Sequence, residues 1–140
     1  MPDKKTIARA RKDKRQGKAA STQAGEFVRE EMHHIREGKH GAASTKQAIA
    51  IGLSKARRAG VELKPPRKGQ TSERTRRSAQ RAYARGHGAP PRSTPSAKRS
   101  RAISRALKRE GHSAASRAAL SHQAHSAAGA RSAASRSAAA

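Results

Sequence analysis

The feature that most constrains this chain is the concentration of its large apolar residues in one stretch, residues 21–63. That stretch holds nine of the fifteen large apolar residues in the sequence and five of its nine acids. Its seven basic residues nearly balance those acids, whereas eighteen basic residues accompany only two acids in the segment that follows. A hydrophobic core can therefore form only around residues 21–63, and we expect a small helical block there.

The remaining composition predicts that little else folds. Leu, Ile, Val and Phe account for only 12 of the 140 residues, and 31 residues are alanine, which favours a helix but buries little surface. Few large apolar residues together with a net charge of +24 are typical of disorder. The sequence therefore predicts a mostly α-helical protein with extensive disorder, in which a small two- to three-helix block is flanked by disordered basic arms.

Two helices are predicted inside the block. Apolar residues recur at spacings of three and four over residues 23–37, and a second such pattern covers residues 44–59. Ser44 begins a capping box at the start of the second helix, and Gly52 would let the first helix approach closely. Glu31 projects into the apolar stripe of the first helix, so we expect it to meet a cation at the edge of the core.

The second helix has apolar residues on two faces, which indicates two packing partners. Ile51 lies on the side away from the main apolar face. Either Val61 and Leu63 fold back onto this helix, or another subunit covers it. About 40 residues are too few for a stable core, so we expect a homodimer through the block, support from a third helix, or folding on a partner.

Composition divides the chain into four parts. A third helix is predicted over residues 73–85, with Ser72 as its N-cap, and a fourth over residues 96–110. Beyond Gly111 the sequence is of low complexity and is predicted to be disordered when free. The four parts are residues 1–20, a basic N-terminal arm; 21–63, the helical hairpin block; 64–95, a linker with the third helix; and 96–140, a basic Ser/Ala/Arg-rich tail that is part helical on binding.

No residue pattern predicts catalysis, a cofactor or a metal site. Glu30 with His33, and Glu31 with His34, have the E-x-x-H spacing of carboxylate metal sites, but the further carboxylates that such sites need are missing. No serine pairs with a nearby base, and no phosphate-binding loop of the Walker type is present. The sequence has no cysteine, which excludes thiolate ligands and disulfides. We therefore expect a protein that is not an enzyme and has no cofactor and no metal ion.

The functional prediction rests on the basic arms. Cations on a chain bind phosphate by releasing counterions, without reading base sequence, and arginine suits phosphate through its bidentate fork. Phe27 and Tyr83 are the only aromatic residues, so stacking on bases is disfavoured and contact with a duplex backbone is favoured. The residues predicted to contact nucleic acid are Arg57, Arg58, Lys98, Arg99, Arg101, Arg105, Lys108, Arg109 and Arg117.

DNA is the first predicted partner and RNA the second, for a nucleoid-associated or histone-like protein that binds largely without sequence specificity. A membrane partner is disfavoured because the chain has no long apolar run and no Trp. The N-terminus lacks the apolar core of a signal peptide, which predicts a cytoplasmic protein at the nucleoid. Two alternatives remain: a protein-interaction module that binds its partner through the helical block, and an RNA- or ribosome-associated factor.

Three runs in the central block carry a resemblance: EFVREEM from Glu26, HIREGKHG from His34, and STKQAIAIGLSKARRAG from Ser44. Together they resemble a family of small basic bacterial proteins of unknown function, and the run from Lys46 to Arg57 is the most specific part. The resemblance covers less than half of the chain and implies a bacterial cytosolic context and a helical block, without an activity or site residues. The tail loosely resembles, in composition alone, the C-terminal arms of linker-histone-like bacterial proteins.

Overall fold

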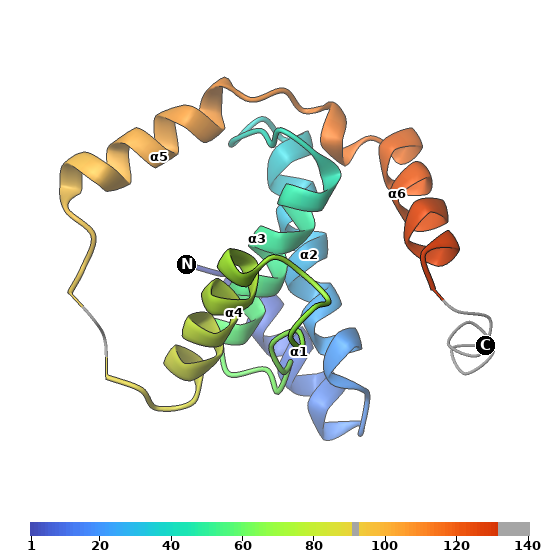
Figure 1. The fold of residues 1–140 in the computed structure, drawn as a ribbon, viewed down its shortest axis with the longest axis vertical. Coiled ribbons are helices and arrows are strands. Elements are labelled where there is room, and N and C mark those ends of the chain that lie inside the picture. The colour runs from blue at the N-terminus through green and yellow to red at the C-terminus, as the bar shows by residue number, and fades with distance from the viewer. Residues whose placement is uncertain (91–92, 132–140) are drawn as a thin grey trace.

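The computed structural model describes residues 1–90 and 93–131, and helices make up most of them (Figure 1). The helical character expected from the sequence is confirmed. The expectation of extensive disorder around two to three helices is wrong, because both basic arms also contain helices. In chain order the elements are α1 (Lys4–Arg15), α2 (Ala20–Arg36), α3 (Thr45–Arg58), α4 (Glu73–Gly86), α5 (Ala97–Arg109), the 3-10 turn η1 (Ser113–Ala115) and α6 (Arg117–Gly129).

The α2–α3 hairpin lies at the centre of the fold (Figure 1). Gly52 on α3 allows the close approach that the sequence predicted, because a Cβ atom at this position would lie 2.7 Å from the Cα atom of Val28 on α2. The start of α2 differs from the prediction. The helix begins at Ala20, and its N-cap residue Ala19 provides no side-chain cap, so Ser21 lies inside the first turn.

The ends of the hairpin helices follow the local signals in the sequence. Gly38 and Gly60 have φ angles of +75° and +89°, the left-handed conformation that glycine adopts after a helix. The predicted capping box of α3 is formed in part, because the Gln47 side chain bonds the amide before the N-cap residue instead of the Ser44 amide. The hydroxyl of Ser44 accepts a hydrogen bond from the Gln47 amide at 3.1 Å, and the Gln47 side chain accepts one from the Ala43 amide at 2.6 Å.

A first hydrophobic cluster joins α1 to the hairpin. Phe27 is its largest member, with 1% of its surface exposed. Leu53 and Leu63 pack against the cluster, so the segment after α3 folds back as in one of the two predicted alternatives, but it packs on the side of Phe27, and Ile51 is not a member of this cluster. The buried members are Ala10, Ala24, Phe27, Ala56 and Val61.

Helix α1 corrects the prediction of a disordered N-terminal arm. Its most buried contact residues are small, since Thr6 is 1% and Ala10 is 4% exposed, and Ile7 packs beside them against the first cluster. Arg9 on this helix pairs with Glu26 on α2, and Lys18 lies 2.7 Å from Asp13 at the helix end. The arm folds because alanine and threonine can pack closely against α2 while the other cations face solvent.

A second cluster at the other end of the hairpin corrects the prediction of disorder for residues 112–131, and the rest of that prediction, residues 132–140, lies outside the described residues. Two of its members, Ala114 and Ala115, come from η1 and are held by their backbone. The Thr45 hydroxyl donates to the Ala114 carbonyl at 2.6 Å, and the Arg36 guanidinium donates to the Ala115 carbonyl at 2.8 Å. The buried members are Met32, Ile35, Ala42, Ala48, Ala114 and Ala115, with Val28, Ile49 and Leu120 packed against them.

Helix α4 packs against α3 and completes a bundle of four helices, α1 to α4. Ala79 and Ala82 are each 6% exposed at this contact. The predicted N-cap is confirmed, because the Ser72 hydroxyl accepts a hydrogen bond from the Thr75 amide at 3.2 Å. The last turn of α4 lies directly against α3, since a Cβ atom on Gly86 would meet backbone of α3.

A polar cluster fastens the α3–α4 connection to α4. The hydroxyl of Tyr83 donates to Glu62 Oε2 at 2.7 Å, and His87 Nε2 lies 2.8 Å from Glu62 Oε1. The rings of Tyr83 and His87 stack with their centroids 3.9 Å apart. These contacts lower the pKa of Glu62, first through the Tyr83 hydrogen bond and then through His87, and the same hydrogen bond raises the pKa of Tyr83.

Helix α5 lies apart from the bundle (Figure 1), and none of its residues is buried. The predicted helix over residues 96–110 is confirmed, with Ser96 as a side-chain cap on the Arg99 amide at 3.3 Å. Within residues 1–90 and 93–131, no helix combines the length and the apolar content needed to cross a lipid bilayer.

The C-terminal end of α5 is attached to the α2–α3 connection by backbone hydrogen bonds. The Gly41 amide donates to the Leu107 carbonyl at 2.8 Å, and the Ala42 amide donates to the Gly111 carbonyl at 3.1 Å. This approach requires glycine, because a Cβ atom on Gly41 would lie 2.0 Å from the carbonyl oxygen of Glu110. The α2–α3 connection therefore holds the C-terminal end of α5 next to the hairpin.

Candidate nucleic-acid interface

The acids of the chain are paired with basic groups inside the bundle. Glu31 lies 2.6 Å from Lys55, and Glu73 lies 2.9 Å from Arg76. Within the described residues, every acid except Glu110 has a lysine, arginine or histidine partner. The bundle therefore compensates part of its own charge and leaves the basic residues of α5 without acids.

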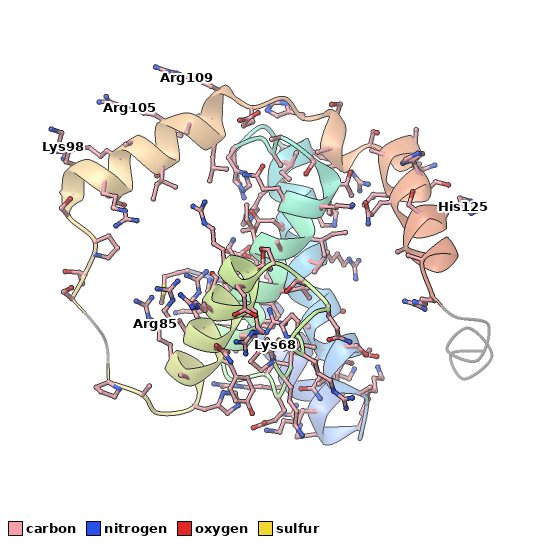
Figure 2. The ribbon with its side chains drawn as sticks, viewed as in Figure 1. Lys68, Arg85, Lys98, Arg105, Arg109 and His125 are labelled. Atoms are coloured by element: carbon pink, nitrogen blue, oxygen red, sulfur yellow. The ribbon has the colours of Figure 1, made fainter. Side chains whose placement is uncertain are left out.

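Five basic residues share one side of α5, which we call the outer face. At about 100° per residue they fall within an arc of roughly 100°, on the side opposite Ile103. All five are exposed, and none has an acidic partner in the part of the chain that the structure describes. Figure 2 shows Lys98, Arg105 and Arg109 pointing away from the bundle. The outer face consists of Lys98, Arg101, Arg105, Lys108 and Arg109.

A second group of cations lines a hollow between α3, α4 and the start of α5, which we call the arginine hollow. Its volume is about 830 Å³. Arg58 comes from α3, Arg81 and Arg85 from α4, and Arg99 from α5. Serine, threonine, proline, alanine and Ile103 complete the lining, and no acid contributes to it.

The arginine hollow concentrates positive charge that the protein itself does not neutralise. The pKa of Arg58 is lowered, first by partial burial and then by the positive charge of Arg85. Both effects disfavour the charged guanidinium, and a neighbouring anion would oppose them. The hollow is therefore suited to a phosphate group, which arginine can bind through two parallel hydrogen bonds.

The structure brings most of the predicted contact residues into these two groups and separates two of them. Arg58 and Arg99 lie in the hollow. Arg57 is only 8% exposed, and its Nε atom donates to the Leu63 carbonyl at 3.0 Å, so it holds the segment after α3. Arg117 is exposed at the start of α6, outside both groups. The contact roles of all these residues remain predictions.

Two residues of the hollow, Arg81 and Arg85, are not among the contact residues predicted from the sequence. Their spacing of four places them on the same side of α4, next to each other. That signal was present in the sequence. The sequence does not predict that α5 lies opposite this side of α4, because that position depends on the backbone hydrogen bonds of Gly41 and Ala42.

Comparisons with known proteins found no match among protein-family models, curated proteins or solved structures. The resemblance to a family of small basic bacterial proteins therefore stays a prediction. A functional proposal for this chain has to rest on the placement of its own charges.

Proposed function

We propose that this protein is a non-enzymatic nucleic-acid-binding protein that contacts the phosphate backbone of duplex DNA largely without sequence specificity. The observation that carries the proposal is the alignment of five unpaired cations on one side of α5. Eight of the nine acids lie in the bundle, where they pair with some of its cations, whereas the outer face presents five cations on one side of a single helix with no acidic partner among the described residues. Such a surface gains affinity by releasing the counterions that surround DNA.

The dimensions of the outer face suit a duplex. The distance along the helix axis from Lys98 to Arg109 is about 16 Å, at about 1.5 Å per residue. DNA carries one negative charge per about 1.7 Å of its axis, so the whole face can lie over phosphates. The arginine hollow lies on the other side of α5 and can hold a phosphate of the same or a neighbouring strand.

The aromatic residues support contact with a duplex backbone over stacking on single-stranded bases. Phe27 is buried in the bundle, and Tyr83 is partly buried and already stacked on His87. Binding of single strands by stacking needs exposed aromatic surfaces. The described residues provide no such surface, which favours double-stranded DNA or a structured RNA.

The alternative of a protein partner that binds the helical block has lost part of its proposed surface. Val61 is 6% exposed inside the first cluster, and Leu63 packs against that cluster. These side chains already have partners within the chain. We therefore place nucleic-acid binding first, with RNA as the alternative that the experiment below separates from DNA.

The test compares two variants of the full chain that lose the same charge. The first replaces the five cations of the outer face by glutamine, which has a similar helix propensity. The matched control replaces five exposed cations of α1 by glutamine. Affinity is measured by fluorescence anisotropy on a labelled DNA duplex and on an RNA hairpin of equal charge. The α1 control positions are Lys4, Lys5, Arg11, Lys12 and Lys14.

We expect the outer-face variant to bind duplex DNA on the order of 100-fold more weakly and the α1 control to change by less than about fivefold. Equal losses in both variants would mean that total charge, rather than the outer face, drives binding, and would contradict the proposal. A wild-type affinity that is higher for the RNA hairpin than for DNA would assign the interface to RNA.

A further inference from the structure

A buried polar cluster in the hairpin takes no part in the proposed interface. Glu31 extends from α2, with 1% of its side chain exposed. Its Oε1 atom lies 2.7 Å from His40 Nε2, and its Oε2 atom lies 2.6 Å from Lys55 Nζ. The expectation that Glu31 meets a cation at the edge of the core is therefore confirmed.

His40 has the orientation of a metal-binding histidine. Its Nδ1 atom lies 3.0 Å from the Gly41 carbonyl oxygen, which can only accept, so Nδ1 carries a hydrogen. The opposite nitrogen, Nε2, then faces the Glu31 carboxylate. Proteins commonly fix a metal-ligating histidine in this way, with one ring nitrogen donating to a backbone carbonyl and the other directed at the ion.

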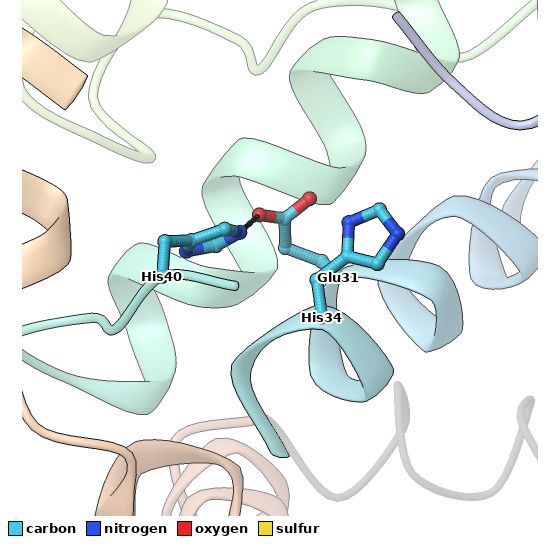
Figure 3. Close-up of side chains that lie close together, drawn as sticks. All are labelled: Glu31, His34 and His40. Carbon is cyan, nitrogen blue, oxygen red and sulfur yellow. Dashed lines mark ion pairs between the residues drawn. The ribbon is translucent and has the colours of Figure 1, made fainter. Parts of the chain in front are cut away.

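His34 adds a third donor, one turn after Glu31 on α2. The ligand atoms of Glu31, His34 and His40 all lie within 4.8 Å of one another. Figure 3 shows the Glu31 carboxylate between the two imidazole rings. The E-x-x-H spacing of Glu31 and His34 was visible in the sequence, but the approach of His40 from the α2–α3 connection was not.

One oxygen of this cluster lacks a hydrogen bond. Lys55 Nζ is close to Glu31 Oε2 but approaches outside hydrogen-bond geometry, so Oε2 is buried with only an ion-pair contact. A buried carboxylate oxygen usually has a hydrogen-bond or metal partner. Lys55 contacts Oε2, so the oxygen that Glu31 directs towards the histidines is Oε1, 2.7 Å from His40 Nε2.

The charges around Glu31 also favour a dication. His34 Nε2 lies 3.9 Å from Glu30 Oε1 and 3.7 Å from Asp3 Oδ2. Lys55 Nζ is the ammonium that contacts both buried carboxylates, at 2.6 Å from Glu31 Oε2 and 4.0 Å from Glu30 Oε1. Glu30 and Glu31 are both buried, and buried charges need partners. A divalent cation beside the histidines would be a second positive partner for these carboxylates.

We propose that Glu31, His34 and His40 form a binding site for a divalent transition-metal ion, with zinc as the best match. Two imidazole nitrogens and one carboxylate oxygen are a ligand set that zinc accepts, with a fourth position left for water. Each ring has to turn slightly, because the Glu31–His40 contact at 2.7 Å is shorter than the separation of two ligands around one ion. The ion would link α2 to the connection that leads into α3.

The experiment uses the full chain, freed of metal and titrated with Co²⁺, whose visible absorption reports tetrahedral coordination by protein ligands. We expect saturation at one Co²⁺ per chain and displacement by Zn²⁺. His40→Ala and His34→Ala are each expected to weaken binding at least tenfold, in line with the loss of a ligand. Two controls, His33→Ala and the pair His122→Ala with His125→Ala, remove exposed histidines and are expected to leave binding unchanged.

A second measurement does not depend on how the variants fold. In the wild-type chain, side-chain ¹⁵N resonances of His34 and His40 are expected to shift on addition of one equivalent of Zn²⁺, while those of His122 and His125 stay in place. Absence of a tetrahedral Co²⁺ spectrum would overturn the proposal. So would binding that follows His122 and His125, because it would belong to the surface of α6.

Discussion

The bundle of α1 to α4 and the single helix α5 use the same residue types in opposite ways. In the bundle, alanines such as Ala24, Ala48 and Ala56 are fully buried, and acids pair with basic groups. In α5 no residue is buried, and the five cations of the outer face have no acidic partner among the described residues. Alanine and arginine are common in both regions, so their presence does not determine which region forms a core and which forms an exposed surface. The few large apolar residues and the acids decide it, and both are concentrated in the bundle.

The largest expected effect separates the two regions by stability. Phe27→Ala removes a side chain that is 1% exposed, so we expect it to lower the free energy of unfolding by about 3–5 kcal/mol. Ile103→Ala removes a side chain that is 53% exposed, and we expect a change below about 0.5 kcal/mol. Urea unfolding followed by circular dichroism measures both. A large loss for Ile103→Ala would contradict the view that α5 contributes little to the core.

The next prediction concerns how α5 is attached. In Gly41→Ala the new Cβ atom would meet the backbone of Glu110 at 2.0 Å, whereas in Gly111→Ala it would meet nothing within 4 Å. We expect Gly41→Ala to cost about 1–3 kcal/mol through this overlap and Gly111→Ala to be nearly neutral.

Hydrogen exchange tests the attachment directly. The amides of Gly41 and Ala42 donate to the segment at the end of α5, so both should lose protection if the overlap breaks these bonds. In Gly41→Ala we expect faster exchange at both positions, and in Gly111→Ala unchanged exchange. Equal protection in the two variants would show that α5 does not depend on this contact.

The smallest expected effect is the pH dependence of the α4 contact. The pKa of Glu62 is lowered from its ordinary value of 4.5, so the contact with Tyr83 and His87 stabilises the fold above pH 4.5 and this contribution is lost as pH falls through the lowered pKa. The pKa of Tyr83 is raised from 10.0, so its contribution is present below pH 10.0 and is lost as pH rises through the raised pKa.

Because the chain has one tyrosine, its absorbance titration reports Tyr83 alone. We expect the pKa of Tyr83 to fall back towards 10.0 in Glu62→Gln. Glu73→Gln serves as the control, because the lowered pKa of Glu73 is caused by Arg76 on the same helix and does not involve Tyr83. An unchanged tyrosine titration in Glu62→Gln would show that α4 is held to the connection in another way.

Sequence reasoning found the elements whose signals are local. Large apolar residues at helical spacing gave α2 and α3, and serine caps followed by helix formers gave α4 and α5. It missed α1, η1 and α6, because each of these elements has at most one large apolar residue in contact with the clusters, Ile7 in α1 and Leu120 in α6, and their other contacts are made by alanine, threonine and backbone carbonyls, which leave no periodic pattern. The sequence pattern also does not predict the burial of Glu30. Glu30 is 4% exposed because the distant Asp3 amide donates to it at 3.2 Å.

The sequence likewise predicts only part of the candidate interface. The spacing of the cations from Lys98 to Arg109 follows from helix geometry and can be read from the sequence. The arginine hollow cannot, because it requires α5 to lie opposite α4, and the hydrogen bond from Gly41 to the Leu107 carbonyl fixes that position. Arg57 illustrates the same limit, since its hydrogen bond to the Leu63 carbonyl withdraws a predicted contact residue from the surface.

The measurement that tests the central claim most directly is the salt dependence of duplex DNA binding by the wild type, the outer-face variant and the α1 control. The slope of log affinity against log salt counts the phosphates that are neutralised, and we expect about −5 to −9 for the wild type. The outer-face variant should be shallower by about 4 to 5, and the α1 control by less than about 1. Equal changes of slope in the two variants would contradict the claim that the outer face of α5, and not the total charge, binds nucleic acid.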